Sequence, residues 1–167
     1  MSKSAVGYEL GSLVYEPFLG LCQVTNLCQE TMLGVQQDFY ELTPRQGNAV
    51  VKVPALQMGS RGIRALLTPQ QIEEALETQP EVAPSPEQET YAQRLRRWTS
   101  ALRSGEVGIG YVFLREWSEM STRGVRFSTK ETEMHENVIR TLTEEISEVL
   151  QISSGKASSR LTRLVGR

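Results

Sequence analysis

The sequence has 167 residues, which is enough for one domain of ordinary size or for two small ones. Hydrophobic residues make up 39% and charged residues 23%, and 18 basic against 20 acidic side chains give a net charge of −2. This composition excludes a disordered chain, a collagen-like fibre and a disulfide-rich secreted miniprotein. No run of about 18 apolar residues occurs, and the first residues lack the apolar core of a signal peptide, so we expect a cytoplasmic protein without a membrane span.

The two cysteines and the single histidine give little support for a disulfide or a metal site. Cys22 and Cys28 are six residues apart in one predicted strand, which places their Cα atoms about 20 Å apart. A disulfide requires Cα atoms within about 7 Å. Because His135 is the only histidine and no CxxC pair occurs, we expect neither a metal nor another cofactor.

Residues 8–67 show the pattern of a small β-domain. Loose alternation and β-rich runs predict strands near residues 8–15, 21–28, 35–42 and 49–53. Glycine and proline residues mark turns every 10 to 14 residues between these runs. Four or five short strands with this spacing indicate a small, strongly bent barrel. A sheet of about 60 residues is near the lower size limit for an independent core, so we expect a helix to cover it.

That helix is expected directly after the strands. Thr68 and Gln71 form a capping box, with Pro69 at the first helical position. The following segment, residues 78–89 (TQPEVAPSPEQE), holds three prolines and no apolar periodicity. We expect a domain boundary in this segment, with one domain at residues 1–79 and a second at residues 80–167.

The second domain is predicted to be helical throughout. Ser85 and Pro86 repeat the capping signature and predict a helix that reaches Ser104, and residues 106–121 are apolar on most sides, which is typical of a buried central helix. Ser128 opens a predicted helix of about 20 residues, and a short helix follows near the end of the chain. The expected fold class is therefore α+β: a small bent β-barrel followed by an all-α bundle of four to five helices.

The charges are unevenly distributed along the chain. Residues 1–79 have a net charge of −3, whereas residues 90–126 carry seven arginines against three glutamates and have a net charge of +4. Four of these arginines share one predicted helix. On a helical projection, Arg94 and Arg97 flank its apolar stripe on one side, and Arg96 and Arg103 flank it on the other.

The arginines and a nearby tyrosine allow two interpretations each. An arginine run on a helix is usually a solvated face, but guanidinium groups also pair well with phosphate oxygens. Tyr91 is either a half-buried core residue or an aromatic ring that projects from the first turns of the helix. We therefore treat Tyr91, Arg94, Arg96 and Arg97 as candidate DNA contacts.

Catalytic motifs are absent from the sequence. It contains no GxGxxG, P-loop, GxSxG, HExxH or EF-hand pattern. His135 and the pairs Glu73–Glu74 and Glu144–Glu145 are most simply solvated residues on helix faces, and nothing in the sequence brings carboxylates together in a cleft. We therefore expect a protein that is not an enzyme.

Several short motifs follow one another in a distinctive order. They are Tyr8–Gly20 (YELGSLVYEPFLG), Val51–Pro54 (VKVP), Gly62–Arg64 (GIR), Leu102–Glu106 (LRSGE) and Arg123–Val125 (RGV). A long acidic helix is predicted after the last of them. In their order and spacing, from about residue 8 to residue 165, these motifs resemble those of the CarD/CdnL family of bacterial transcription regulators.

The resemblance implies a fold and a function. Residues 1–79 would form a Tudor-like domain, similar to the polymerase-interacting domain of transcription-repair coupling factor, that binds the β subunit of RNA polymerase. The helical domain would contact promoter DNA through the minor groove at the upstream edge of the transcription bubble and stabilise the open complex. The expected polymerase contacts are Lys52, at the family's basic strand position, and Met32, at the tip of the second hairpin.

The sequence departs from the family at two of its positions. Tyr91 stands where the family usually carries a tryptophan that inserts into DNA, and Glu30 stands where arginine is frequent. The chief alternative is a protein-interaction adaptor without direct DNA contact. We expect a monomer in either case.

Overall fold

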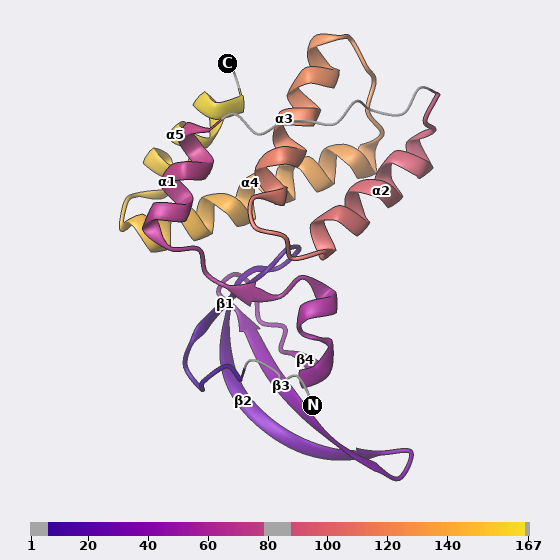
Figure 1. Cartoon of the computed structure of the whole chain (residues 1–167), viewed down its shortest axis with the longest axis vertical. Helices are drawn as coiled ribbons and strands as arrows, with labels where there is room; N and C mark the ends of the chain where they lie inside the picture. Colours follow the sequence, from indigo (N-terminus) through magenta and orange to yellow (C-terminus); the bar gives the residue numbers. More distant parts are fainter. Residues whose placement is uncertain (1–6, 79–87, 166–167) are drawn as a thin grey trace.

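The computed structural model describes residues 7–78 and 88–165 of the chain. The described chain is α+β, with a five-stranded antiparallel sheet followed by five α-helices (Figure 1). The strands are β1 (Leu13–Glu16), β2 (Gly20–Met32), β3 (Val35–Pro44), β4 (Val51–Pro54) and β5 (Arg64–Ala65), and two short 3₁₀ turns, η1 (Ala55–Gln57) and η2 (Gly59–Arg61), lie between β4 and β5. The helices are α1 (Pro69–Glu77), α2 (Tyr91–Arg103), α3 (Ile109–Thr122), α4 (Thr129–Leu150) and α5 (Ser154–Val165).

The sheet has the strand order β4-β3-β2-β1-β5 and is open, because β4 and β5 at its two edges do not pair in the described residues. The expected closure into a barrel is therefore not observed.

The strand predicted at residues 21–28 is longer than expected. It continues through polar residues to Met32, because the hairpin keeps its pairing as far as Met32 opposite Val35. Leu33 and Gly34 close that hairpin with positive φ angles of 52° and 79°, as a two-residue loop requires.

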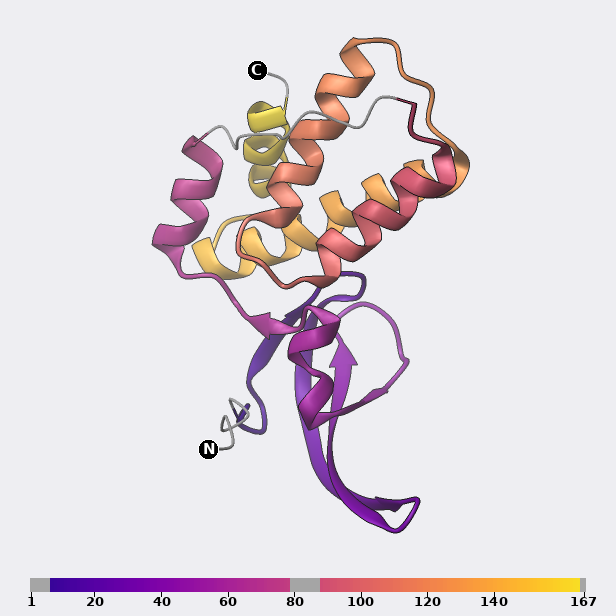
Figure 2. The same ribbon diagram turned by 45° about the vertical axis from the view of Figure 1, so that its right-hand side comes forward.

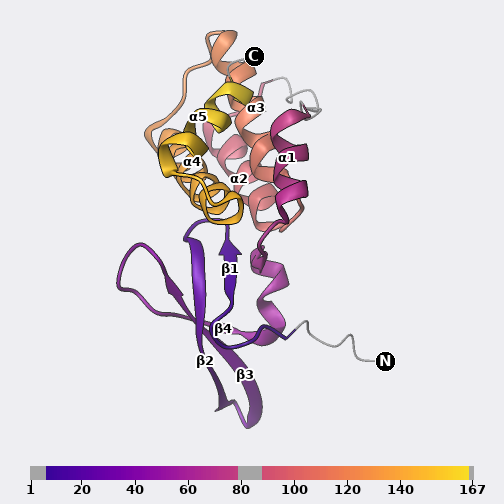
Figure 3. The ribbon, with the colours of Figure 1, turned by 90° about the vertical axis from the view of Figure 1, so that its left-hand side faces the viewer.

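The helices gather at one end of the sheet, and the β2–β3 hairpin curves away from them at the other end (Figures 1 and 2). The view turned by 90° shows the same division, with α4 directly above β1 and β2 (Figure 3). Among the described residues, no helix is long and apolar enough to cross a membrane.

Local capping determines where three of the helices begin. Thr68 caps α1 and Ser128 caps α4, and in both cases the complete capping box that the sequence predicts is formed. The helix predicted to open at Ser85 begins instead at Tyr91, because Thr90 and Gln93 form the capping box there. Ser85 and Pro86 themselves lie outside the described residues, as does most of the predicted linker.

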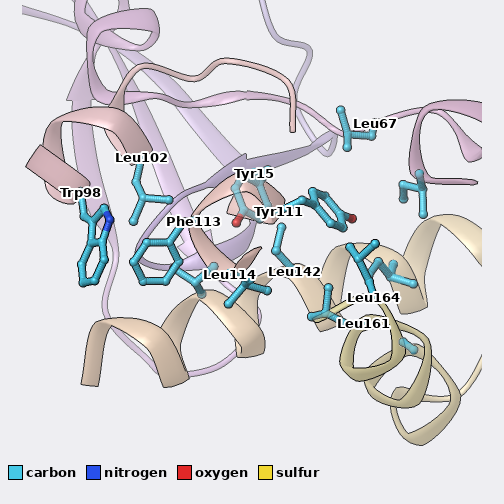
Figure 4. Close-up of a cluster of buried hydrophobic side chains, with 14 of the residues drawn as sticks. Tyr15, Leu67, Trp98, Leu102, Tyr111, Phe113, Leu114, Leu142, Leu161 and Leu164 are labelled. Carbon is cyan, nitrogen blue, oxygen red and sulfur yellow. The ribbon is translucent and has the colours of Figure 1, made fainter. Parts of the chain in front are cut away.

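The buried residues form two clusters. The smaller one lies within the sheet and includes Val14, Val24 and Leu42. The larger one joins the sheet to the helices, because Tyr15 and Leu21 share it with residues of every helix (Figure 4). A residue buried in such a cluster contributes stability through the apolar surface it removes from water, about 25 cal/mol per Å².

Helix α1 belongs to this larger cluster. Ile72 is fully buried there, and α1 packs against α4 and α5. The expectation that this helix covers the sheet is therefore corrected. The domain boundary expected at residues 79/80 falls in the undescribed segment 79–87, and α1, although on its N-terminal side, lies with the helices (Figure 1).

Polar contacts cross the same junction between the sheet and α4. Arg64 of β5 donates two hydrogen bonds, of 2.7 and 2.9 Å, to the carboxylate of Glu145, which is completely buried. Glu145 also accepts a bond from the amide of Leu67, and Glu144 accepts one from the amide of Leu21. The interpretation of Glu144 and Glu145 as solvated charges is therefore wrong, because both face the sheet.

Candidate nucleic-acid and polymerase interfaces

Tyr91 is the first residue of α2 and lies on its exposed end. The Thr90 capping box fixes the start of the helix immediately before it. The side chain remains 54% exposed, and on its inner side the Cζ atom of Arg94 lies 5.4 Å from the ring centroid. Tyr91 therefore projects from the helical layer, and its ring is available for contact with another molecule.

Arg94 lies one turn further along α2 and faces the protein interior. Its Nε atom donates a 2.5 Å hydrogen bond to Glu131, and the guanidinium also reaches the carbonyl of Arg126. Both Arg94 and Glu131 are buried. Burial acts to raise the pKa of Glu131, but hydrogen bonds from Arg94 and Ser128 outweigh it and hold that pKa below its usual value. Because the guanidinium group of Arg94 is bound to Glu131 inside the protein, Arg94 is not included among the proposed phosphate contacts.

Arg97, on the same side of the helix, also makes internal ion pairs. It donates hydrogen bonds of 2.8 and 3.0 Å to Glu89 and of 2.6 and 3.1 Å to Glu116. These bonds raise the pKa of Arg97 above its usual value. Trp98 donates to Glu116 as well, at 3.0 Å. Arg97 is therefore a bridge between α2, α3 and the residues before α2, although one edge of it is exposed.

Arg96 and Arg103 lie on the opposite side of the apolar stripe and differ from the first pair. Both are exposed, and in residues 7–78 and 88–165 no carboxylate lies within salt-bridge distance, 4.0 Å, of either. Seven residues separate them, so they occupy one face of α2 two turns apart. Arg103 has a close aromatic neighbour, Phe18, whose ring centroid lies 5.3 Å from the guanidinium carbon. The helix thus uses one side for internal ion pairs and leaves the other side charged and solvated.

Sequence reasoning placed these four arginines on the correct sides of the stripe but did not separate their roles. The capping box at Ser128 was a usable signal for Arg94, because Glu131 of that box is its ion-pair partner. Arg103 was identified on the helix but was not included among the DNA contacts. Its exposure next to Phe18 depends on a contact with the sheet that no local pattern shows.

The second candidate interface is the far half of the β2–β3 hairpin. Met32 is 51% exposed at its end, and the apolar side chains of Leu33 and Val35 beside it are exposed as well. Exposed apolar residues that lie next to one another are typical of protein-binding surfaces. The structure keeps this hairpin and the Tyr91 end of α2 apart, at opposite ends of the molecule (Figure 1).

Lys52 lies on β4, the edge strand that pairs with β3 of the hairpin, and its ammonium group is ion-paired with Glu30 of β2. The hydrogen bond to Glu30 raises the pKa of Lys52 above its usual value. Phe39 of β3 lies beside the ammonium group, 5.8 Å from Nζ to the ring centroid. Glu30 stands at the position where arginine is frequent in the family. It is the ion-pair partner of Lys52, the residue that the family resemblance assigns to the polymerase contact.

His135 is not exposed as the sequence suggested. It is half-buried and stacked on Trp117, with ring centroids 4.3 Å apart, and Trp117 stacks in turn on Phe127 at 3.6 Å. Burial lowers the pKa of His135, and Glu136 opposes the shift. The histidine thus forms part of an aromatic cluster between α3 and α4.

The described residues hold no group of three or more histidine, cysteine, aspartate or glutamate side chains placed to bind a metal ion. Cys22 and Cys28 both lie on β2, as predicted, and are free thiols. Of the acidic pairs, Glu73 is bonded to Arg160 and Glu145 to Arg64. These carboxylates are held in ion pairs on separate parts of the molecule.

No family model matches this sequence. No curated protein matches it either. A family is therefore proposed below on the motifs and on the geometry of the two surfaces.

Proposed function

We propose that this protein is a non-enzymatic transcription regulator of the CarD/CdnL type, which binds the β subunit of bacterial RNA polymerase and contacts promoter DNA at the upstream edge of the bubble. The observation that carries the proposal is the exposed side of α2, where a half-exposed aromatic ring, Tyr91, begins the helix and the exposed arginines Arg96 and Arg103 follow along it. Aromatic wedges combined with cations that contact the backbone are a common way to hold distorted DNA.

The sheet supports the polymerase part of the proposal. Its five strands form an open sheet with a long, curved β2–β3 hairpin (Figure 1), so we interpret the sheet as an open form of a Tudor-like domain. Met32 and the exposed apolar residues beside it would pack against the β subunit, with Lys52 and Glu30 at the edge of the contact. An apolar centre with a polar rim is the usual composition of such an interface.

The proposed mechanism combines tethering with insertion. Once the sheet is bound to polymerase, the helical part is held at high effective concentration beside the promoter. Tyr91 would insert at the upstream fork of the bubble and oppose reannealing, because closure of the duplex must first expel the ring. Sequence specificity should be slight, since α2 does not present a set of base-reading asparagine and glutamine side chains.

The adaptor alternative is also favoured by one observation. Arg94 and Arg97 are engaged in internal ion pairs, so two of the four predicted DNA contacts already have structural partners. In this alternative the hairpin would bind a protein and α2 would remain a solvated helix face.

A binding experiment with the full chain separates the two functions. Immobilised protein is incubated separately with RNA polymerase and with a fluorescent promoter duplex that is forked at the upstream edge of the bubble. The proposal expects polymerase to be retained, and it expects the duplex to be retained without polymerase and to be released as salt is raised. Retention of polymerase without retention of the duplex would support the adaptor, and failure to retain polymerase would contradict the proposed polymerase contact.

A further inference from the structure

A groove of about 780 Å³ runs along the exposed side of α2. Its lining on α2 extends from Ala92, next to Tyr91, to Ser104 at the end of the helix, and Ser60 of η2 forms the facing wall. Arg96 and Arg103 both line it. Twelve residues of helix correspond to about 18 Å, so the groove leads from the candidate wedge to the sheet part of the molecule. Figures 1 and 2 show the 3₁₀ turns directly beneath the C-terminal end of α2.

The two walls of the groove are fixed against each other by backbone contact. Gly62, which follows η2, has a φ of +76°, and a Cβ atom there would lie 2.8 Å from the carbonyl oxygen of Arg103. A Cβ on Gly105 would lie 3.2 Å from the Cα of Gly62. Only glycine permits so close an approach with this backbone conformation. The position of η2 relative to α2 is therefore set by the fold.

Besides Arg96 and Arg103 in its lining, the groove has a third arginine beside it, Arg61, which follows the lining residue Ser60 on η2. Arg61 of η2 is exposed, and its guanidinium is hydrogen-bonded to the Gln57 side chain at 3.5 Å. Like Arg96 and Arg103, it has no carboxylate within 4.0 Å among the described residues. Burial raises the pKa of the Glu16 carboxyl, and backbone hydrogen bonds, Arg103 and Arg61 all act to lower it. Arg103 of α2 and Arg61 of η2 therefore both act on the Glu16 carboxyl.

We propose that this groove holds the sugar–phosphate backbone of one DNA strand, gripped by Arg96 and Arg103 from α2 and by Arg61 from η2. The inference rests on the proposed function and extends it, because it makes the sheet part a DNA contact as well as a polymerase contact. Seven residues of helix separate Arg96 from Arg103, or about 10 Å. One strand carries a phosphate about every 3.4 Å of duplex axis, so these arginines would contact phosphates about three positions apart.

The number of these phosphate contacts can be measured from the way DNA affinity falls as salt is raised. Binding of the full chain to a fluorescein-labelled forked duplex is measured by anisotropy at several salt concentrations. Three phosphate contacts give a slope of log affinity against log salt of about −3, and each removed contact reduces it by about 0.9. Arg61→Ala and Arg103→Ala should each produce this reduction. Arg163→Ala, which removes an exposed arginine of α5, should not.

A second variant tests the wall of the groove without removing a cation. Ser60→Asp should weaken DNA binding, because a carboxylate on η2 repels the phosphates of the DNA backbone. The affinity of this variant should also fall less with rising salt than the affinity of the wild type. Ser159→Asp, on the exposed side of α5, is the matched control for the added charge. Folding of each variant is checked by circular dichroism.

The outcomes distinguish this inference from the proposed function. If the wild type binds with a salt-dependent slope and Arg96→Ala reduces it, but Arg61→Ala and Ser60→Asp behave like their controls on α5, the sheet part does not contact DNA and the inference is wrong while the function stands. If the wild type shows no salt-dependent binding, the proposed DNA contact itself is contradicted.

Discussion

Arg94 and Arg96 are two residues apart on α2 and have opposite surroundings. Arg94 is buried against Glu131, whereas Arg96 is exposed on the lining of the groove. Their positions around the helix explain the difference, since 200° of rotation places one beside the aromatic core and the other in solvent. An arginine at one position of α2 can therefore stabilise the fold, while an arginine two residues later is exposed for ligand binding.

Replacement of the two arginines by alanine should separate these roles. Arg94→Ala leaves the Glu131 carboxylate buried without its partner, which should lower the free energy of unfolding by about 3–5 kcal/mol. Arg96→Ala should change it by less than about 0.5 kcal/mol, because the side chain is exposed and makes no ion pair in the described part of the chain. Urea denaturation followed by tryptophan fluorescence measures both. Equal effects of the two variants would contradict the assignment.

His135 should make stability depend on pH. Its pKa in the folded protein lies below the usual value of 6.5 because the ring is partly buried against Trp117. The unfolded chain therefore binds a proton before the folded protein does, and the free energy of unfolding should fall as the pH decreases below about 6.5. His135→Phe keeps an aromatic ring in the stack and should flatten the dependence between about pH 5 and 7. An unchanged pH profile would assign the dependence to other groups.

At the scale of elements, the β2–β3 hairpin is the clearest case of a segment that is folded but not packed. Its far half exposes most of its side chains on both faces, so pairing between the two strands and the Leu33–Gly34 turn must hold it. Such an extended hairpin is marginal alone and suits a segment that becomes covered by a partner.

Met32→Glu tests the hairpin as the polymerase contact. Because Met32 is half-exposed, the substitution should leave the free energy of unfolding within about 0.5 kcal/mol of the wild type. Capture of the polymerase β subunit should weaken by at least about fivefold, since a charge would replace an apolar contact in the interface. Val107→Glu, at an exposed apolar position between α2 and α3, provides the control. Unchanged capture by Met32→Glu would remove the hairpin tip from the interface.

The elements that the sequence predicted well are those with local signals. The capping boxes at Thr68 and Ser128 and the apolar stripe of α2 depend on residues a few positions apart, and so the helices they open were found. The packing of α1 on α4 and α5 and the buried partner of Arg94 depend on residues far apart in the chain. Hydrophobic periodicity shows which face of α1 is buried but not which element covers it.

For the molecule as a whole, the junction between sheet and helices sets how the two candidate surfaces are placed. Tyr15 donates or accepts a 2.9 Å hydrogen bond with Thr141, and Arg64 binds Glu145, both across this junction. Burial raises the pKa of Tyr15, which keeps its hydroxyl protonated. The proline-rich segment predicted a domain boundary at residues 79/80, and in the described residues a shared core and a buried ion pair connect the sheet to the helices.

Glu145→Gln should reveal that connection. The variant leaves Arg64, which is largely buried, without its counter-charge, and the free energy of unfolding should fall by about 3–5 kcal/mol. Glu148→Gln, which removes the exposed pair with Arg45, should cost about 1 kcal/mol or less. Denaturation is followed by circular dichroism for the whole chain and by the fluorescence of Trp98 and Trp117 for the helices. If Glu145→Gln were no more harmful than its control, the two parts would not depend on this contact.

The most direct test of the account is the lifetime of the open promoter complex, measured with RNA polymerase, promoter DNA and either the wild type or Tyr91→Ala. Loss of a stacking contact worth about 1–2 kcal/mol should shorten the lifetime about 5- to 30-fold, while polymerase binding is unchanged. Tyr91→Trp should preserve or lengthen it, because the larger ring covers more of the base pair. If Tyr91→Ala folds, binds polymerase and leaves the lifetime at the wild-type value, Tyr91 is not a wedge in the open complex and the central claim is contradicted.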